Sequence, residues 1–282
     1  MAIVNRTRDS FYAGNRHYDD ESAYAAVESA LSDGADIVDV GGVRAGQEGE
    51  AVSVEQEIER VVPFLIEVRR RHPEAVLSLD TWRSPVASAA AEASLDLVND
   101  TWAGHDPSLV EVAARIGAGV VCSHSGGLPP RTDPVAVRFA RDGESEEVAL
   151  LTDVRRVLTS GAHRALSVGI PRDRILLDPT LDFGKTTAHS LALVRHTQDF
   201  VDLGFPVLQA ISRKDFVGES LDLPADERLE GSLAATAIAA WQGATVFRTH
   251  DVRATRRVLD MVATIRGDRP PVRQERGVSG SA

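Results

Sequence analysis

The 282-residue chain is poor in cysteine and in basic residues. Its single cysteine, Cys122, lies within an apolar run and cannot form an internal disulfide or a multi-cysteine metal site. This favours a reducing compartment and a structural, buried thiol. The chain has 31 Lys and Arg against 42 Asp and Glu, a formal net charge of −11. Nucleic-acid-binding domains carry an excess of Lys and Arg, so this balance argues against a nucleic-acid surface but allows a small anion in a local basic pocket.

Long hydrophobic runs are also missing. No segment reaches the length of a membrane-spanning helix. The N-terminus, Met-Ala-Ile-Val-Asn, has neither the basic start nor the apolar stretch of a signal peptide. We therefore expect a cytoplasmic protein with no nucleic-acid and no membrane partner.

Three common chemical motifs are absent as well. The sequence has no G-x-G-x-x-G or P-loop, which argues against a dinucleotide-binding or P-loop fold. It has no G-x-S-x-G elbow, so covalent hydrolase chemistry has little support. The eight histidines lack the close spacing that structural zinc requires.

What the sequence does contain is one recurring pattern. A short apolar run ends at polar residues or glycine and is followed by helical sequence. Near-continuous apolar strands are typical of a parallel sheet covered on both faces. The eight runs are 2–5, 36–42, 75–81, 95–100, 119–124, 174–179, 206–214 and 244–251.

Amphipathic stretches between these runs predict helices, for example over 21–32, 54–71, 84–93 and 106–116. Ser84-Pro85 and Asp106-Pro107 are typical helix starts, with a capping side chain before a proline. Strand and helix alternating eight times predict an α/β fold, a single (β/α)8 TIM barrel over residues 1–266. A doubly wound open sheet is the rival. Residues 267–282 are rich in Pro, Arg, Gly and Ser and predict a flexible C-terminal tail.

Polar side chains gather where the predicted strands end. In a barrel these ends converge on one mouth, where active sites are built. Asp80, Asn99 and Asp178 suit a flat heterocycle with several N–H groups, because carboxylates accept and amides do both. Arg213, Lys214, Arg248 and His250 form a basic cluster suited to a phosphate. The alternatives are that the carboxylates only cap loops and that the cations are solvated surface charges.

Over residues 2–266 the sequence resembles the dihydropteroate synthase family. The specific motifs are Asn-Arg-Thr-Arg-Asp-Ser-Phe at 5–11, Asp-Pro-Thr-Leu-Asp-Phe-Gly-Lys at 178–185, Ser-Arg-Lys at 212–214 and Arg-Thr-His-Asp-Val at 248–252. Lesser matches are 78–81, Asn99-Asp100 and the segment around His124.

The resemblance implies a transferase of folate biosynthesis. It would join 6-hydroxymethyl-7,8-dihydropterin diphosphate to 4-aminobenzoate and release diphosphate. Mg2+ would be the cofactor, with Asn5 as its ligand, and the protein would be a homodimer. By the same resemblance, the pterin-binding residues are Asp80, Asn99, Asp178 and Lys214, the diphosphate-binding residues are Asn5, Arg248 and His250, and the aminobenzoate-pocket residues are Phe183, Ser212 and Lys214. The catalytic set is Asp80, Asp178, Lys214, Arg248 and His250.

The sequence departs from the family pattern in its loops. The second loop, Gly41-Gly42-Val43-Arg44-Ala45-Gly46, lacks the family's Ser, Thr and Pro, and Arg6 and Arg8 replace Val and Pro in the first. Thr180 and Asp182 stand in place of glycines, and so does Ala210. Three interpretations stay open: an active synthase, a diverged paralogue that binds pterin without normal turnover or uses another acceptor, and a pterin-domain methyltransferase.

Overall fold

A computed structural model describes residues 1–7, 20–44, 51–132 and 137–276. Six strands form one parallel sheet in sequence order, and two more form a parallel pair. The strands are β1 (Ala2–Asn5), β2 (Ile37–Gly41), β3 (Val76–Asp80), β4 (Leu97–Asp100), β5 (Gly119–Ser123), β6 (Ile175–Asp178), β7 (Leu208–Gln209) and β8 (Val246–Phe247).

Two isolated bridges close these strands into a ring. Ala2 pairs with Thr249 and Leu177 pairs with Val207, both in parallel, so β8 meets β1 and β6 meets β7. The Thr249 N–H donates to the Met1 carbonyl at 2.9 Å, which ties the end of the ring to its beginning. The prediction of a single (β/α)8 barrel is therefore confirmed, and the open sheet is excluded.

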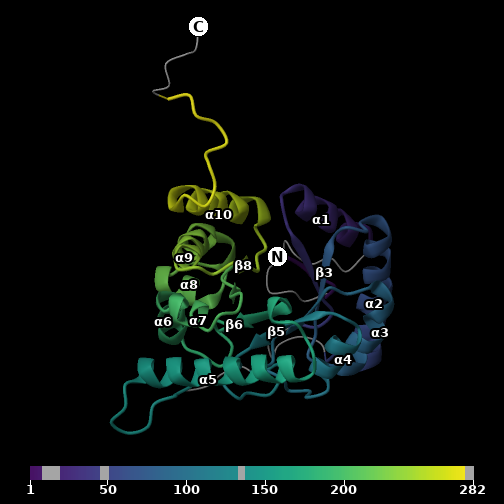
Figure 1. The fold of residues 1–282 in the computed structure, drawn as a ribbon, viewed down its shortest axis with the longest axis horizontal. Helices are drawn as coiled ribbons and strands as arrows, with labels where there is room; N and C mark the ends of the chain where they lie inside the picture. The colour runs from purple at the N-terminus through teal and green to yellow at the C-terminus, as the bar shows by residue number, and fades with distance from the viewer. Residues whose placement is uncertain (8–19, 45–50, 133–136, 277–282) are drawn as a thin grey trace.

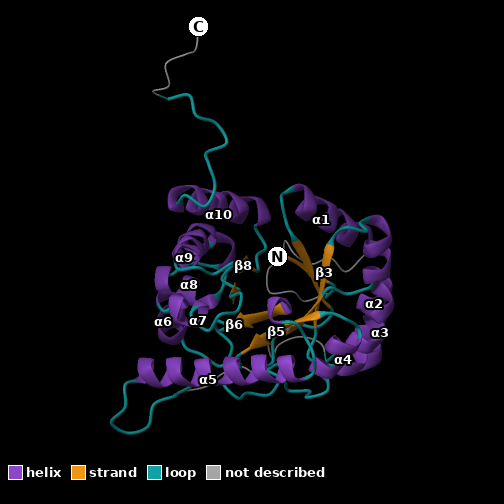
Figure 2. Ribbon diagram, in the orientation of Figure 1, coloured by secondary structure: helices purple, strands orange, loops and turns teal. Residues whose placement is uncertain are grey.

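Helices surround this ring on the outside (Figures 1 and 2). The main helices are α1 (Asp20–Ser32), α2 (Val54–Arg71), α3 (Ser84–Ala89), α4 (Leu109–Arg115), α5 (Glu146–Ser167), α6 (Thr187–Arg195), α7 (Thr197–Val201), α8 (Asp215–Leu221), α9 (Leu229–Trp241) and α10 (Val252–Arg266). The described ranges also contain short 3-10 turns: η2 (Ala90–Ala93), η3 (Arg172–Arg174) and η4 (Ala225–Glu227).

The predicted helix starts at 54 and 84 are confirmed, whereas the predicted start at 106 and the two predicted caps are wrong. Helix α2 begins at 54 as predicted, and Ser53 and Gln56 form a capping box. The predicted cap Ser84 is instead the first residue of α3, and its N–H donates to the Asp106 carboxylate at 2.7 Å. Asp106 therefore caps α3, and α4 begins only at Leu109.

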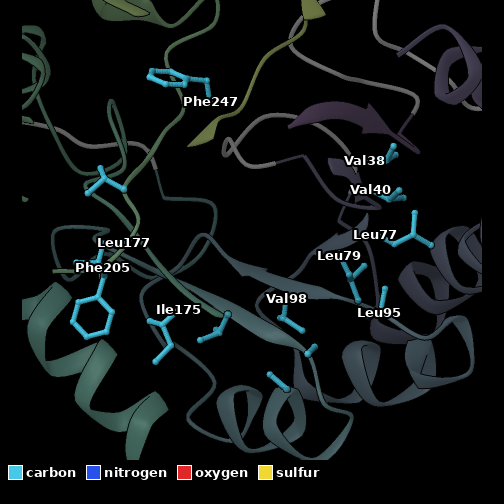
Figure 3. Close-up of a cluster of buried hydrophobic side chains, with 14 of the residues drawn as sticks. Val38, Val40, Leu77, Leu79, Leu95, Val98, Ile175, Leu177, Phe205 and Phe247 are labelled. Atoms are coloured by element: carbon cyan, nitrogen blue, oxygen red, sulfur yellow. The ribbon is translucent and has the colours of Figure 1, made fainter. Parts of the chain in front are cut away.

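The apolar core has two layers that follow the two faces of each strand. Residues such as Val38, Leu77, Val98 and Ile175 point outward and pack against the helices (Figure 3). A second, smaller cluster has side chains from the strands and their immediate neighbours but none from helices, so it fills the barrel interior: Met1, Leu97, Val121, Leu176, Leu208 and Ala210, with Ile37 and Val246 against it.

The interior changes from apolar to polar along each strand. Residues two apart on a strand share a face. Ile37 is thus followed by Asp39, Leu97 by Asn99, Leu176 by Asp178 and Val246 by Arg248. The barrel has an apolar floor at the strand N-termini and a layer of polar groups above it, at the carboxyl ends.

After the last strand, α10 ends at Arg266 and Gly267 adopts a left-handed φ of 82°. Residues 267–276 contain neither helix nor strand. The flexible tail over 267–282 stays a prediction, and its last six residues lie outside the described part of the chain. No helix in the described ranges is long and apolar enough to cross a membrane.

Candidate functional site

The centre of the mouth is an arginine shared by two carboxylates. Arg248, just after β8, donates from Nε to Asp39 Oδ2 and from Nη2 to Asp80 Oδ2, both at 2.7 Å. Asp39 is fully buried in the middle of β2. One guanidinium and two carboxylates leave this cluster with a net charge of −1, held in the barrel interior.

Side chains on β3 and β4 also donate hydrogen bonds to the Asp39 carboxylate. Ser78 on β3 donates to Asp39 Oδ1 at 2.5 Å, and Asn99 on β4 donates from Nδ2 to Oδ2 at 3.1 Å. The register places Asp80 beside Asn99, and Gly41 beside Asp80. Asn99 Oδ1 is buried without a protein partner among the described residues, so an acceptor remains for a ligand in the mouth.

Burial dominates the electrostatics of this layer. Burial, together with the neighbouring charge of Asp39, raises the pKa of Asp80 to about 7, against the opposing effect of Arg248. Burial acts to lower the pKa of Arg248, but the charges of Asp39 and Asp80 outweigh burial, and the pKa of Arg248 is raised. Asp80 can therefore take up a proton near neutral pH.

Asp178 enters the mouth from the end of β6. Its Oδ1 accepts the Thr180 N–H at 2.7 Å, and Thr180 has a left-handed φ of 56°. Burial raises the pKa of Asp178, while the Thr180 N–H and then the charges of Lys214, Lys185 and Arg248 act to lower it. Asp178 thus lies within the electrostatic reach of Arg248, as a shared mouth requires.

Lys214 and Phe183 form the side of the mouth next to Asp178. Lys214 Nζ donates to the Leu181 carbonyl at 2.6 Å and lies 4.3 Å from the centre of the Phe183 ring. The Phe183 ring meets the Trp102 ring edge-on at 5.1 Å between centres. Burial lowers the pKa of Lys214, with the charges of Asp182 and Asp178 opposing the shift.

Ser212 and His250 are joined across the last two strand ends. Ser212 Oγ lies 3.1 Å from His250 Nδ1 and accepts the His250 N–H at 3.2 Å. Burial, and then the charge of Arg248, lower the pKa of His250 to about 4. The expectation that His250 adds a positive charge is wrong for the unliganded protein at neutral pH, where the imidazole is a neutral hydrogen-bonding group.

Arg213 is a second correction to the expected basic cluster. Its guanidinium forms a two-point ion pair with Asp251 at 2.9 and 3.0 Å. It also donates to the Ala225 and Asp226 carbonyls, and only 5% of the residue is exposed. Arg213 therefore joins the β7 and β8 loops to η4 and has a structural role.

Asn5 ends β1 and pairs in register with Gly41. A Cβ placed on Gly41 would lie 3.7 Å from both Asn5 Oδ1 and Asp80 Oδ2, so the two oxygens flank the same glycine. No group of three or more His, Cys, Asp or Glu side chains in the described ranges could hold a metal ion. Residues 8–11 of the first motif and 45–46 of the second loop lie outside those ranges.

Two buried charged residues at the mouth were missed from sequence. Asp39 lies inside an apolar run, and a charge in a buried strand was the available signal, since such a charge needs a partner. Lys185 was quoted only as part of a motif. It is 4% exposed and donates to the carbonyls of His124, Thr180 and Phe183 at 2.7 to 2.9 Å. It thereby fixes the loop after β6.

The fold and this mouth define a (β/α)8 barrel with a buried, mixed-charge ligand site, and comparison with known proteins specifies its family. Residues 1–250 match the family described as "Pterin binding enzyme". The chain is 51% identical to the inactive dihydropteroate synthase 2 of Mycobacterium leprae, over 99% of this chain and 94% of that protein. It is 34% identical to the dihydropteroate synthase of Haemophilus influenzae, over 92% and 90%.

A solved structure gives the same result. The dihydropteroate synthase of Coxiella burnetii in complex with pteroic acid superposes with a TM-score of 0.83 at 30% identity, covering 95% of this chain and 93% of that one. The chain therefore belongs to the pterin-binding enzyme family, among the dihydropteroate synthases and their relatives.

Proposed function

We propose that this protein binds 6-hydroxymethyl-7,8-dihydropterin diphosphate in the barrel mouth and is a diverged dihydropteroate synthase paralogue, with little or no condensation to 4-aminobenzoate. The observation that carries the proposal is the polar layer itself. Asp80, Asn99 and Asp178 come from three strands and present directed acceptors beside Arg248.

The pterin ring would lie against these acceptors. Its ring N–H and amino groups need carboxylate or amide oxygens in fixed directions. Asp178 and Asn99 Oδ1 supply them, and Asp80 accepts once it is ionised. Lys214, turned across Phe183, would donate to a ring oxygen or nitrogen from the other edge.

The diphosphate would lie above Arg248 and His250, with Asn5 on the opposite side. Arg248 is already engaged by two carboxylates, so it offers the leaving group less charge than a free arginine. Mg2+ fits this position only in part. Asn5 Oδ1 is an oxygen ligand of the kind Mg2+ accepts, and the remaining ligands would be diphosphate oxygens and waters. When bound, Mg2+ would neutralise diphosphate charge.

The chemistry such a site favours is transfer at the pterin methylene carbon. The carbon–oxygen bond to diphosphate breaks, its electron pair leaves with the diphosphate, and an amine nitrogen forms the new bond and loses a proton. Positioning and electrostatic stabilisation would provide most of the rate. Asp80 and Asp178 would stabilise positive charge developing on the pterin, while Arg248 and His250 would bind the departing anion.

An active synthase is the second candidate, and the intact polar layer favours it. The paralogue is preferred for two reasons. The 51% identical relative from Mycobacterium leprae carries the name of an inactive synthase. The glycine-replacing residues Thr180 and Asp182 adopt left-handed φ angles of 56° and 68°, conformations that ordinarily favour glycine. Both lie in the loop after β6, next to Phe183. We call the part of the mouth formed by Phe183, Ser212 and Lys214 the acceptor side, because the resemblance implies that 4-aminobenzoate binds there.

Two measurements separate these candidates. Titration calorimetry with the pterin diphosphate and Mg2+ tests binding, and a turnover assay with added 4-aminobenzoate tests condensation. Binding without product at enzymatic rates supports the paralogue. Product at ordinary rates supports the synthase, and no binding rejects both. Repeating the titration without Mg2+ tests whether the ion is needed.

A homodimer and a cytoplasmic location belong to the same proposal. Helices α9 and α10 pack together and expose large apolar side chains: Ile238, Trp241, Met261 and Ile265 are 52 to 61% exposed. Covering such groups is a common reason for self-association. Sedimentation of the wild type and of Trp241→Glu tests this, because the variant should be a monomer if α9 contributes to the interface. The lone cysteine supports the location.

A further inference from the structure

Asp182 is a partly exposed carboxylate in the loop after β6, on the acceptor side of the mouth. It follows Leu181, whose carbonyl binds Lys214, and it precedes Phe183. Its Oδ2 accepts the Asp215 N–H at 2.7 Å and the Phe216 N–H at 3.4 Å. These are the first two N–H groups of α8, whose own preceding residue, Lys214, provides no side-chain cap.

A second contact fixes the orientation of this carboxylate. Ser190 Oγ is fully buried, accepts the Asp182 N–H at 3.0 Å and donates to Asp182 Oδ1 at 3.0 Å. Both oxygens are therefore engaged by α6 and α8. Aspartate at this position, despite its left-handed φ, bridges two helices across the β6 loop.

The electrostatic effect of Asp182 falls on Lys214. Among the charges that act on the Lys214 pKa, Asp182 has the largest effect and Asp178 the next. The charges of three carboxylates, Asp182, Asp178 and Asp215, thus act on one ammonium group. The nearby Lys185 does not restore the balance on the ligand side, because its Nζ is turned to three carbonyls of the β6 loop.

From these contacts we infer that Asp182 determines acceptor specificity: it excludes acceptors that carry a carboxylate and leaves the site suited to a neutral or cationic amine. A carboxylate ligand would find the α8 N–H groups occupied, the Lys214 charge compensated and a fixed negative charge nearby. This inference depends on the proposed function, since it names the acceptor class of the same mouth.

The test compares two ligands that differ in charge but hardly in shape, 4-aminobenzoate and 4-aminobenzamide. Each is titrated into protein saturated with 6-hydroxymethyl-7,8-dihydropterin, diphosphate and Mg2+. This mixture lacks the activated carbon, so no turnover intervenes. We expect the wild type to bind the amide about tenfold more tightly than the carboxylate, the size of a screened charge–charge repulsion at the edge of a protein.

Asp182→Asn keeps an oxygen for the α8 N–H groups and removes the charge. It should raise the affinity for 4-aminobenzoate about tenfold and change that for the amide less than twofold. Glu219→Gln is the matched control: it removes a carboxylate from α8, but one that is exposed and accepts the Thr187 hydroxyl. It should leave the ratio unchanged.

The outcomes separate the two proposals. If the pterin itself does not bind, the proposed function fails and this inference fails with it. Only the specificity inference fails if the pterin binds but the ratio of the affinities for 4-aminobenzamide and 4-aminobenzoate is the same in the wild type and in Asp182→Asn. It also fails alone if the pterin binds but neither the wild type nor Asp182→Asn binds either arylamine. A higher affinity for 4-aminobenzoate in Asp182→Asn, with no such rise in the control variant, supports the specificity inference. Thermal unfolding of each variant checks that the β6 loop is intact.

Discussion

The two sides of the barrel mouth are built differently. On the first, Asp39, Asp80, Asn99 and Arg248 lie on or directly after strands and bind one another at 2.7 to 3.1 Å. On the second, Asp182, Phe183 and Lys214 lie in loops and bind mainly backbone groups. Asp80, Asn99 and Arg248 on the first side are residues that the resemblance to dihydropteroate synthase names, whereas Asp182 on the second side replaces a glycine of the family pattern.

The difference has a physical reason. A buried charge can be replaced only if its partner changes too, because an uncompensated charge in a low dielectric is costly. A loop residue that binds backbone N–H groups has more freedom, since many side chains can satisfy those groups. The residues on the loop side can therefore change while those on the strand side stay the same. Four measurements test whether the strand side and the loop side differ in this way.

The largest effect is expected from Arg248→Met, which leaves Asp39 and Asp80 buried without their cation. Breaking a buried ion pair from one side costs about 3 to 5 kcal/mol of unfolding free energy. Urea denaturation measures it. The control is Arg70→Met. The Arg70 side chain is 70% exposed and forms an ion pair with Glu67, and its loss should cost less than about 0.5 kcal/mol. Equal losses in both variants would contradict the structural role of the strand side.

Lys185→Met should have the next largest effect. It removes the buried donor of three carbonyls, and unsatisfied buried acceptors cost about 1 kcal/mol or more each, so we expect a loss of about 2 to 3 kcal/mol. The same denaturation measures it. Arg172→Met, which removes an exposed hydrogen bond to the Gly204 carbonyl, should cost less than about 1 kcal/mol. A stable Lys185→Met protein would show that the β6 loop is held by other contacts.

Asp178→Ala should weaken binding of the pterin diphosphate by about 10- to 150-fold, corresponding to the loss of one charged hydrogen bond of about 1.5 to 3 kcal/mol. Titration calorimetry measures it. Asp178→Asn, which keeps an acceptor for the Thr180 N–H, separates a ligand effect from a folding effect. Asp260→Ala, on the distant α10, should leave the affinity within twofold. Unchanged binding in Asp178→Ala would remove Asp178 from the site.

The smallest effect concerns pH. The pKa of Asp80 is raised to about 7, so the carboxyl is protonated below that pH and a carboxylate acceptor above it. If only the ionised form accepts the pterin N–H, affinity should rise about tenfold between pH 6 and pH 8. Titrations across this range measure it, and Asp80→Asn should lose the rise. A wild-type affinity independent of pH would mean that Arg248 keeps Asp80 ionised throughout.

Sequence alone determined the order of the fold. Eight apolar runs separated by amphipathic stretches specify a barrel, because a strand must bury both faces and a helix one. The 54–71 helix even has the predicted bounds, since its hydrophobic period and Ser53 cap act locally. Asp80, Asn99 and Asp178 were found because strand ends converge in any such barrel.

Which of these charges are available to a ligand depends on the tertiary structure. Arg213 and Arg248 look alike in sequence, yet Arg213 is fixed by Asp251 while Arg248 joins Asp39 and Asp80 across the mouth. His250 loses its expected charge through burial beside Arg248, and Asp182 finds its N–H partners 33 residues further along the chain. Local sequence fixes hydrogen-bonding capacity and backbone preference, but the partner of a charge, and therefore its protonation, depends on which distant strands the closed ring brings together.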